Sequence, residues 1–414
     1  MSKTKTNSEQ PPATRKSAFF SPLGIICAVI IVAVPLYWVL AQTPEFISLE
    51  KRYRASWPFF SSHTLLDGTW GEQAEEWMTD KMPARSFWVG LESYMNLLTG
   101  RQNAQDIIRD SNGNLLDAPP RYSQTELLRR LDRFIQLSDA LDTEIFLIIP
   151  PTAGYTSKSA LPEHIWRCYN DDILAEAVIA HMPADSFVDL RSEFLGADEA
   201  LFYRTDHHWN SAGVYLAYTS LCAQMGLDPL PADDFIVSRN GGFYGSTYAK
   251  SGLWLTEADE IEMWAPPYDV HVYFGDSAVS AIGTGAETDG EIIVYDSLFF
   301  TEHLLERDQY SVFLDGIQGL TLIERLPSDA GLPSGRPEPP GSEMLLVIKD
   351  SYANSLIPLL VPHFRQIIMV DLRHYRLPVT ELAQDIGLTE RGGQVLAVYS
   401  ADHIVNDSDI FWLR

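Results

Sequence analysis

Apolar residues follow two spacings along this chain, and each spacing predicts a different kind of element. Short, nearly continuous apolar runs predict buried strands, whereas apolar residues three and four positions apart predict an amphipathic helix. Residues 125–142, TELLRRLDRFIQLSDALD, have the helical spacing. The strand-like runs are 143–150, 186–191, 343–350, 366–373 and 394–400.

Several of the strand-like runs end in polar residues and are followed by helical patterns. This alternation is typical of a mostly parallel sheet that is covered by helices. We therefore predict an α/β domain over residues 119–414. Ligands bind beyond the carboxyl ends of the strands in such domains, so polar residues at those ends are the first candidates for a site.

Residues 43–118 precede that domain and are rich in aromatic side chains. Within them, Leu91, Tyr94, Met95 and Leu98 recur at helical spacing. We expect a helical segment that links the main domain to the N-terminal region.

The run from Leu23 to Ala41 contains 19 residues without a charge, about the length of a helix that crosses the hydrocarbon core of a membrane. We expect residues 21–42 to form one transmembrane anchor. The basic arm 1–20 would then stay in the cytoplasm, and the main domain would lie outside. A cleaved signal peptide is the alternative, because Val39 and Ala41 are spaced like the small residues of a cleavage site.

The net charge restricts the partners. The chain has 30 basic and 56 acidic residues, a formal charge of −26. Residues 1–42 hold four of the bases and one of the acids, so the remainder has 26 bases against 55 acids, a balance of −29. Such a surface repels polyanions, which argues against a nucleic-acid partner.

Three cysteines give little information about the compartment. Cys27 lies in the predicted anchor, and Cys168 and Cys222 lie in the main domain. Their spacing is compatible with a disulfide or with two separate buried thiols.

The stretch FYRTDHHWNSAG, residues 202–213, holds the first candidate chemistry. Residues two apart point the same way in extended backbone, so Asp206 can orient His208 as a general base while His207 faces the other side. Ser211 is the expected N-cap of the helix that follows. The alternatives are a polar loop with two ordinary histidines, or a metal site without an evident third ligand.

The stretch LLVIKDSYANSLIPLL offers a nucleophile. Its apolar strand ends at Lys349, Ser351 lies in the turn, and an apolar helical run begins at Tyr352. A serine in such a strand-turn-helix context is well placed for attack, because helix N-terminal amides can stabilise an oxyanion. The alternative is that Ser351 only caps the helix.

A second serine motif is Gly275-Asp276-Ser277, the tripeptide that opens many esterases of the SGNH type. The residues after it are rich in glycine and lack a helical spacing. We expect a β-hairpin or meander turn there and a structural role for Ser277.

The runs RTDHHWN, YGSTYAKSG and IKDSYANSLIPLLVPHF resemble the bacterial DHHW family, which is related to the alginate O-acetylation proteins. The resemblance extends to EKRYRASWP, FLIIPPTAGYTSK and FLDGIQGL and covers most of the chain after the anchor. It implies an SGNH-hydrolase-like three-layer α/β/α domain. By this resemblance Asp206 and His208 match the Asp-x-His motif of the family, and Ser351 matches its nucleophile.

The resemblance also suggests residues around the triad. Tyr352 and Gln318 are candidates for the oxyanion hole, and Arg204 and Tyr248 for lining the site, whereas Trp209 is expected to pack. Lys349 stands where the wider superfamily has the first glycine of its Gly-Asp-Ser turn.

The function expected from these residues is acyl transfer outside the cytoplasm, with no cofactor and no metal. The resemblance implies O-acetylation of a cell-surface or exported polysaccharide, with a membrane-bound O-acyltransferase as a possible acetyl donor. A polysaccharide O-acetylesterase would use the same triad. A non-catalytic polysaccharide assembly or binding factor is the third alternative.

Overall fold

The computed structural model of the chain describes residues 22–40, 46–47, 52–101, 103–104, 106–282, 292–327, 332 and 342–413. The predicted arm 1–20 lies outside these residues. The chain divides into two compact units. The first comprises Met1–Ile47 and Lys51–Val89, and the second comprises Ser48–Glu50 and Gly90–Arg414.

The first unit is mainly helical. It holds α1 (Pro22–Leu40), the antiparallel pair β1 (Phe46–Ile47) and β2 (Arg52–Tyr53), α2 (Ser62–Leu66), α3 (Thr69–Asp80) and the start of α4 (Arg85–Leu98). No helix in the described part of the chain is both long enough and apolar enough to span a membrane. The predicted helix around Leu91–Leu98 is confirmed as α4.

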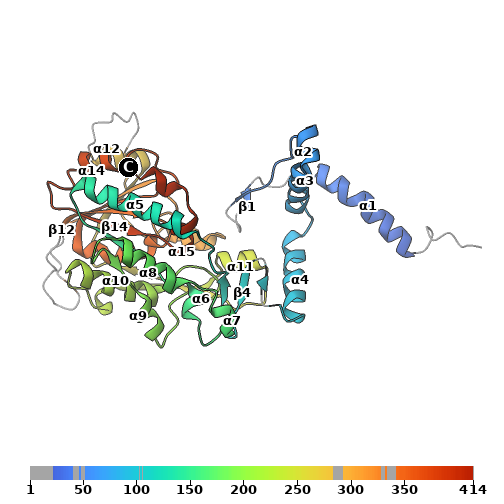
Figure 1. The fold of residues 1–414 in the computed structure, drawn as a ribbon, viewed down its shortest axis with the longest axis horizontal. Helices are drawn as coiled ribbons and strands as arrows, with labels where there is room; N and C mark the ends of the chain where they lie inside the picture. The colour runs from blue at the N-terminus through green and yellow to red at the C-terminus, as the bar shows by residue number, and fades with distance from the viewer. Residues whose placement is uncertain are drawn as a thin grey trace, which may run out of the picture. The chain divides into compact units, whose positions relative to one another are not determined.

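The second unit is built on a seven-stranded sheet (Figure 1). Its order is β10 (Val270–Phe274), β11 (Leu320–Arg325), β13 (Phe364–Val370), β12 (Ser342–Lys349), β14 (Gln394–Val398), β6 (Ile145–Ile148) and β7 (Phe187–Val188). The five strands from β13 to β7 pair in parallel, whereas β10 and β11 pair antiparallel with their neighbours. The prediction of a mostly parallel sheet is therefore confirmed.

Smaller elements complete this unit. The helices are α5 (Gln124–Leu141), α6 (Ala153–Thr156), α7 (Glu163–Trp166), α8 (Asp171–His181), α9 (Arg191–Gly196), α10 (Ser211–Met225), α11 (Ser246–Ser251), α12 (Gly275–Ile282), α13 (Ala353–Leu360), α14 (Val379–Asp385) and α15 (Ala401–Asn406). The remaining strands are β3 (Asn103–Ala104), β4 (Ile107–Arg109) and β5 (Leu115–Asp117) in one small sheet, and the hairpin of β8 (Ile236–Phe243) and β9 (Asp259–Ala265).

Helices cover both faces of the large sheet, because alternate strand residues enter two separate cores. In β12, Leu346 and Ile348 pack with residues of α5, α8, α14 and α15. Leu345 and Val347 point the other way and pack with residues of α10 and α13. This period of two produces three layers, helix, sheet and helix.

Two local predictions are wrong. The hairpin or turn predicted after Ser277 is wrong for its first residues, because 278–282 belong to α12 and Ala278 packs in the core. Residues 283–291 of that stretch lie outside the described part of the chain. The segment 43–118 is not helical throughout, since its end forms the small sheet β3-β4-β5. Cys168 is exposed and Cys222 is buried, and both are free thiols.

One buried histidine in this core links stability to pH. His363 is fully buried, and its Nε2 accepts the hydroxyl of Tyr218 at 2.7 Å. Burial, assisted by the charge of Arg325, lowers the pKa of His363 to about 4. Its Nδ1 has no hydrogen-bond partner among the described residues, so the native state disfavours protonation.

We predict that the chain loses stability on acidification partly through His363. Its pKa lies near 6.5 in the unfolded chain and lower in the native state. Only the unfolded state therefore binds the proton as the pH falls from 6.5 toward 4, and the native state loses roughly 2–3 kcal/mol. Urea unfolding at pH 7 and pH 4.5 should show a smaller loss for His363→Gln than for wild type or the exposed control His164→Gln. Equal losses in all three proteins would contradict this.

Candidate active site

The motif loop 202–209 is closed by main-chain contacts at its base. Phe202 and Trp209 form an antiparallel bridge, and the amide of Tyr203 donates to the carbonyl of His208 at 3.2 Å. Asp259 of β9 accepts the amides of residues 204 and 205 at 2.9 and 2.8 Å. The side chains at the tip of the loop are therefore held in one place.

Three predicted residues meet at the tip of this loop. His208 Nδ1 lies 2.5 Å from Asp206 Oδ1, and His208 Nε2 lies 2.8 Å from the hydroxyl oxygen of Ser351. Asp206 and His208 are buried, whereas Ser351 is partly exposed. The structure thus brings together an acid, an imidazole and a hydroxyl in the order that a triad requires.

The Asp206 carboxylate determines the tautomer of His208. A carboxylate only accepts hydrogen bonds, so His208 Nδ1 carries the proton and Nε2 is left to accept the Ser351 hydroxyl. Burial alone would raise the pKa of Asp206. The neighbouring imidazoles of His207 and His208 and the amide of Ser246, at 2.6 Å from Oδ2, outweigh burial and hold that pKa well below its usual range.

Ser351 lies in the turn between β12 and α13, as predicted. The preceding Asp350 is buried and ties this turn to the neighbouring strand end. Its carboxylate accepts the amides of Tyr352 at 2.9 Å and Ser400 at 2.7 Å, and His403 Nδ1 lies 2.7 Å away. The nucleophile candidate is thus positioned by residues that follow β12 and β14, at the carboxyl ends of parallel strands.

Lys349 extends this buried network. Its ammonium group donates to Asn354 at 2.8 Å and lies 3.6 Å from Asp371. Lys349, which stands where the wider superfamily has a glycine, is therefore buried beneath the turn and paired with Asp371.

Two further aromatic residues hold the His208 region. The ring of Tyr310 stacks on that of His208, with centroids 3.8 Å apart and planes 8° apart, and its hydroxyl donates to Ser355 at 3.0 Å. Trp209 is fully buried and donates to the same Ser355 at 3.0 Å. Packing was predicted for Trp209, but no sequence signal identified Tyr310, which lies 102 positions after His208.

The predicted orientation of His207 is wrong. Its ring lies beside that of His208, with centroids 3.9 Å apart, and its Nδ1 lies 2.6 Å from the hydroxyl of Ser246. Residues 204–208 form bends rather than a strand, so side chains do not alternate there. Partial burial and the neighbouring His208 lower the pKa of His207 to about 4. Asn210, and not Ser211, caps the following helix, because its side chain accepts the Gly213 amide at 3.1 Å.

An oxyanion hole requires donors that are not already used. Tyr352 packs beside His208, but its hydroxyl donates to the His207 carbonyl and its amide donates to Asp350. The amide of Ser351 has no acceptor among the described residues. It is therefore a backbone donor at this turn that is open to an oxyanion.

The other predicted lining residues have partners elsewhere. The Gln318 side chain donates to Asp315 within its own turn, and the Arg204 guanidinium pairs with Glu257. Tyr248 packs against Tyr244. No contact between these three side chains and the triad is found in the described part of the chain.

The Gly-Asp-Ser serine has a different environment. The hydroxyl of Ser277 accepts the amide of Ile293 at 3.0 Å on the exposed surface. No histidine contacts it among the residues that the structure describes. The geometry therefore favours Ser351 as the nucleophile.

The motif loop also contains side chains that could bind a metal ion. Ligand atoms of Asp206, His207 and His208 lie within 4.8 Å of one another. However, both nitrogens of His208 already face Asp206 and Ser351. A metal ion on His208 would have to displace one of these contacts.

A layered α/β domain with contacting Asp, His and Ser side chains at the carboxyl ends of its parallel strands has the arrangement that serine hydrolases use. The model of the DHHW protein family matches residues 190–370, which include all three residues. This part of the chain is therefore similar to the DHHW family.

Solved structures of two other proteins share the fold. A DHHW family protein from Eubacterium siraeum aligns with a TM-score of 0.56 and 19% identity, over 74% of this chain and 94% of that chain. Bacillus cereus PatB1 with a sulfonyl adduct aligns with a TM-score of 0.57 and 19% identity, over 74% of this chain and 98% of that chain. The O-acetyltransferase domain of Pseudomonas putida AlgJ is more distant, with a TM-score of 0.40 and 14% identity, over 74% of this chain and 95% of that chain. A comparison with curated protein sequences finds no significant match.

The loop YGSTYAKSG contains a glycine, Gly245, that the site requires. A Cβ atom on Gly245 would lie 2.2 Å from Cβ and Oδ2 of Asp206, which is closer than atoms can pack. Only glycine therefore allows the Ser246 amide to approach the Asp206 carboxylate.

We predict that Gly245→Ala displaces Asp206 and lowers acyl-transfer activity by about 100-fold, the cost of a misplacement of about 1 Å. The measurement is the initial rate on an aryl acetate, with thermal unfolding as a check of the fold. Gly241→Ala is the matched control, because nothing lies within 4 Å of a Cβ atom there. Similar rates for both variants would show that Gly245 does not position Asp206.

Proposed function

We propose that this protein is a serine acyl-transfer enzyme that moves acetyl groups to or from the hydroxyls of a polysaccharide. The observation that carries the proposal is the continuous chain of contacts from Asp206 through His208 to Ser351, at 2.5 and 2.8 Å. Its location at the carboxyl ends of parallel strands is where ligands bind in α/β domains.

The first step follows from the tautomer of His208. As the Ser351 oxygen attacks the acetyl carbonyl carbon, its proton passes to His208 Nε2, and the Asp206 carboxylate stabilises the imidazolium. The amide of Ser351 is placed to donate to the oxyanion. Collapse of the tetrahedral intermediate breaks the bond to the leaving oxygen, which takes the proton from Nε2 and leaves acetyl-Ser351.

The second step uses the same groups in reverse. His208 removes a proton from the acceptor hydroxyl as that oxygen attacks acetyl-Ser351, and it returns the proton to the Ser351 oxygen. If the acceptor is a sugar, the protein is an O-acetyltransferase, whereas water makes it an esterase. We place the transferase first, on the resemblance of the motifs to the DHHW and alginate O-acetylation proteins.

The location outside the cytoplasm is part of this proposal. It rests on the sequence alone, on the uncharged run 23–41 and the basic arm before it, since no helix in the described part of the chain is long and apolar enough to span a membrane. A membrane-bound O-acyltransferase would supply acetyl groups from inside. Protease treatment of intact cells should then degrade the domain after residue 42, and its full protection while a surface marker is cleaved would contradict this location.

We predict that Ser351→Ala lowers the rate of aryl acetate cleavage by the full chain at least about 1,000-fold, because removal of one triad member disables the unit. Ser277→Ala is the matched control and should keep the wild-type rate. A chelator should leave the wild-type rate unchanged, because no proposed step uses a metal.

Several outcomes would contradict the proposal. Full activity of Ser351→Ala with loss of activity in Ser277→Ala would move the nucleophile. Loss of activity with the chelator would favour a metal site at the motif loop. If no acetyl ester is cleaved and no acetyl reaches an added neutral oligosaccharide, the non-catalytic binding factor is the better account.

A further inference from the structure

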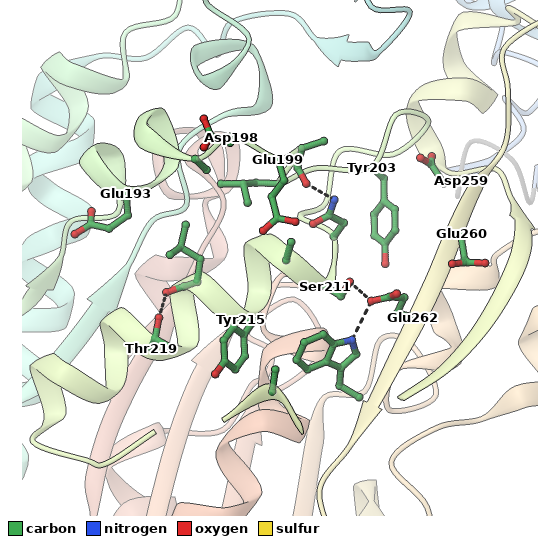
Figure 2. Close-up of a pocket in the computed structure, with 18 of the residues that line it drawn as sticks. Glu193, Asp198, Glu199, Tyr203, Ser211, Tyr215, Thr219, Asp259, Glu260 and Glu262 are labelled. Atoms are coloured by element: carbon green, nitrogen blue, oxygen red, sulfur yellow. Dashed lines mark hydrogen bonds between the residues drawn. The ribbon is translucent and has the colours of Figure 1, made fainter. Parts of the chain in front are cut away.

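A large cavity lies beside the site and contains none of the triad residues. It has a volume of about 1190 Å³ and lies between α9, α10 and the β8-β9 hairpin (Figure 2). Cavities that hold small ligands commonly have roughly 300–1,000 Å³. This one can therefore accept more than a single small ion.

The cavity is strongly acidic. Its lining includes six carboxylates and, among the described residues, no Lys, Arg or His; the six are Glu193, Asp198, Glu199, Asp259, Glu260 and Glu262. Glu260 and Glu262 both form ion pairs with Arg239, which is not a lining residue. Asp259 accepts the amides of residues 204 and 205 in the motif loop. The other three carboxylates, those of Glu193, Asp198 and Glu199, have no ion pair within the described part of the chain, so they are available to a cation.

Tyr203 supplies a second, independent feature. It is only 5% exposed, yet its hydroxyl has no hydrogen-bond partner among the described residues. Figure 2 shows this hydroxyl pointing toward the side of the cavity where Ser211 and Glu262 lie. The body of this side chain is buried while its hydroxyl reaches the cavity surface, so a ligand atom could take the place of water as its hydrogen-bond partner.

The charges around Tyr203 define what it can do. Burial, with Asp206, Asp259 and Glu262 nearby, raises its pKa well above the usual range, so it is a neutral donor. Burial would also raise the pKa of Glu262, but hydrogen bonds from Ser211, Arg239 and Trp264 outweigh it and keep the carboxylate charged. The wall therefore combines a neutral hydroxyl with negative charge.

Aromatic rings form another part of the wall. Tyr215 and Trp264 both line the cavity, and their ring centroids lie 5.4 Å apart. Each side chain is only partly buried. Aromatic faces provide apolar surface for the C–H side of a sugar ring and attract cations.

A second, smaller cavity shares part of its lining with the large cavity and also reaches Ser355 of α13. It shares Tyr203, Ser211, Glu262 and Trp264 with the large cavity and adds Ser355. Ser355 accepts the hydroxyl of Tyr310, whose ring stacks on His208. Asp206, His208 and Ser351 do not line the large cavity, so a ligand there would not occupy the place of the reacting acetyl group.

We propose that the cavity is an accessory binding site for a saccharide segment that carries free amino groups. Its several ammonium groups would pair separately with the carboxylates of Glu193, Asp198 and Glu199, which lie apart from one another in Figure 2. A sugar face would pack on Trp264 and Tyr215, and a sugar oxygen would accept the Tyr203 hydroxyl. The inference rests on the proposed function for the choice of a saccharide. It excludes a polyanionic glycan at this position, because six carboxylates would repel it.

The test is titration calorimetry on the full chain carrying Ser351→Ala, which prevents turnover. The probes are a tetramer of glucosamine and a tetramer of N-acetylglucosamine, which differ in charge but not in backbone. We expect the free-amine tetramer to bind at least about tenfold more tightly, and its affinity to fall with added salt. Equal affinities for the two tetramers would overturn the proposal.

Variants test the site itself. Glu193→Gln with Glu199→Gln, and separately Tyr203→Phe, should each weaken binding of the free-amine tetramer about tenfold. The control is Glu144→Gln with Glu302→Gln, which removes the same charge from exposed positions elsewhere. If the control variant weakens binding as much as the cavity variants do, the affinity depends only on the net charge of the protein, and the proposal fails.

A tetralysine peptide distinguishes a sugar site from a general cation site. It should bind at least about tenfold more weakly than the free-amine tetramer, because it offers no sugar face to Trp264. Equal or tighter binding of the peptide would overturn the saccharide assignment. Binding is measured without turnover, so the two tests are independent. A failure to bind the tetramer would not affect the Ser351 activity test, and a failure of the activity test would not affect the binding result.

Discussion

The buried carboxylate of Asp206 is the constraint on which the rest of the site depends. A charge removed from water must be matched by donors, and Asp206 receives them from the amide and Nδ1 of His208 and from the amide of Ser246. This pairing selects the tautomer of His208 and thereby directs Nε2 to Ser351. Gly245 is required beside it because any larger residue would occupy the space of the carboxylate.

The layered fold brings the two halves of the site together across 143 positions of the chain. The motif loop is held by its own bridge and by Asp259, whereas Ser351 is held by Asp350 at the ends of β12 and β14. Tyr310, Trp209 and Ser355 join the two loops from the side of α13. These contacts set the triad distances without a contribution from substrate.

The sequence predicts much of the sheet and the contact of Asp206, His208 and Ser351 because each of these depends on local patterns. Apolar runs identify five of the seven strands of the large sheet, and a serine after a strand that leads into a helix identifies Ser351. The antiparallel strands β10 and β11 were not predicted from the apolar pattern. The orientation of His207 was predicted wrongly because residues 204–208 form bends. The rule that side chains alternate applies only to extended backbone. Tyr310 and Gly245 matter only through contacts with residues distant in sequence, so tertiary structure alone identifies them.

The central claim is that Ser351 forms a covalent acetyl intermediate under the control of His208 and Asp206. The most direct measurement is to mix the full chain with an aryl acetate, quench it in acid within the first turnovers, and map acetylated peptides by mass spectrometry. We predict one acetyl group on the peptide that contains Ser351, absent from Ser351→Ala. Turnover without acetyl on that peptide, or acetyl on another residue that forms and decays at the rate of turnover, would contradict the account.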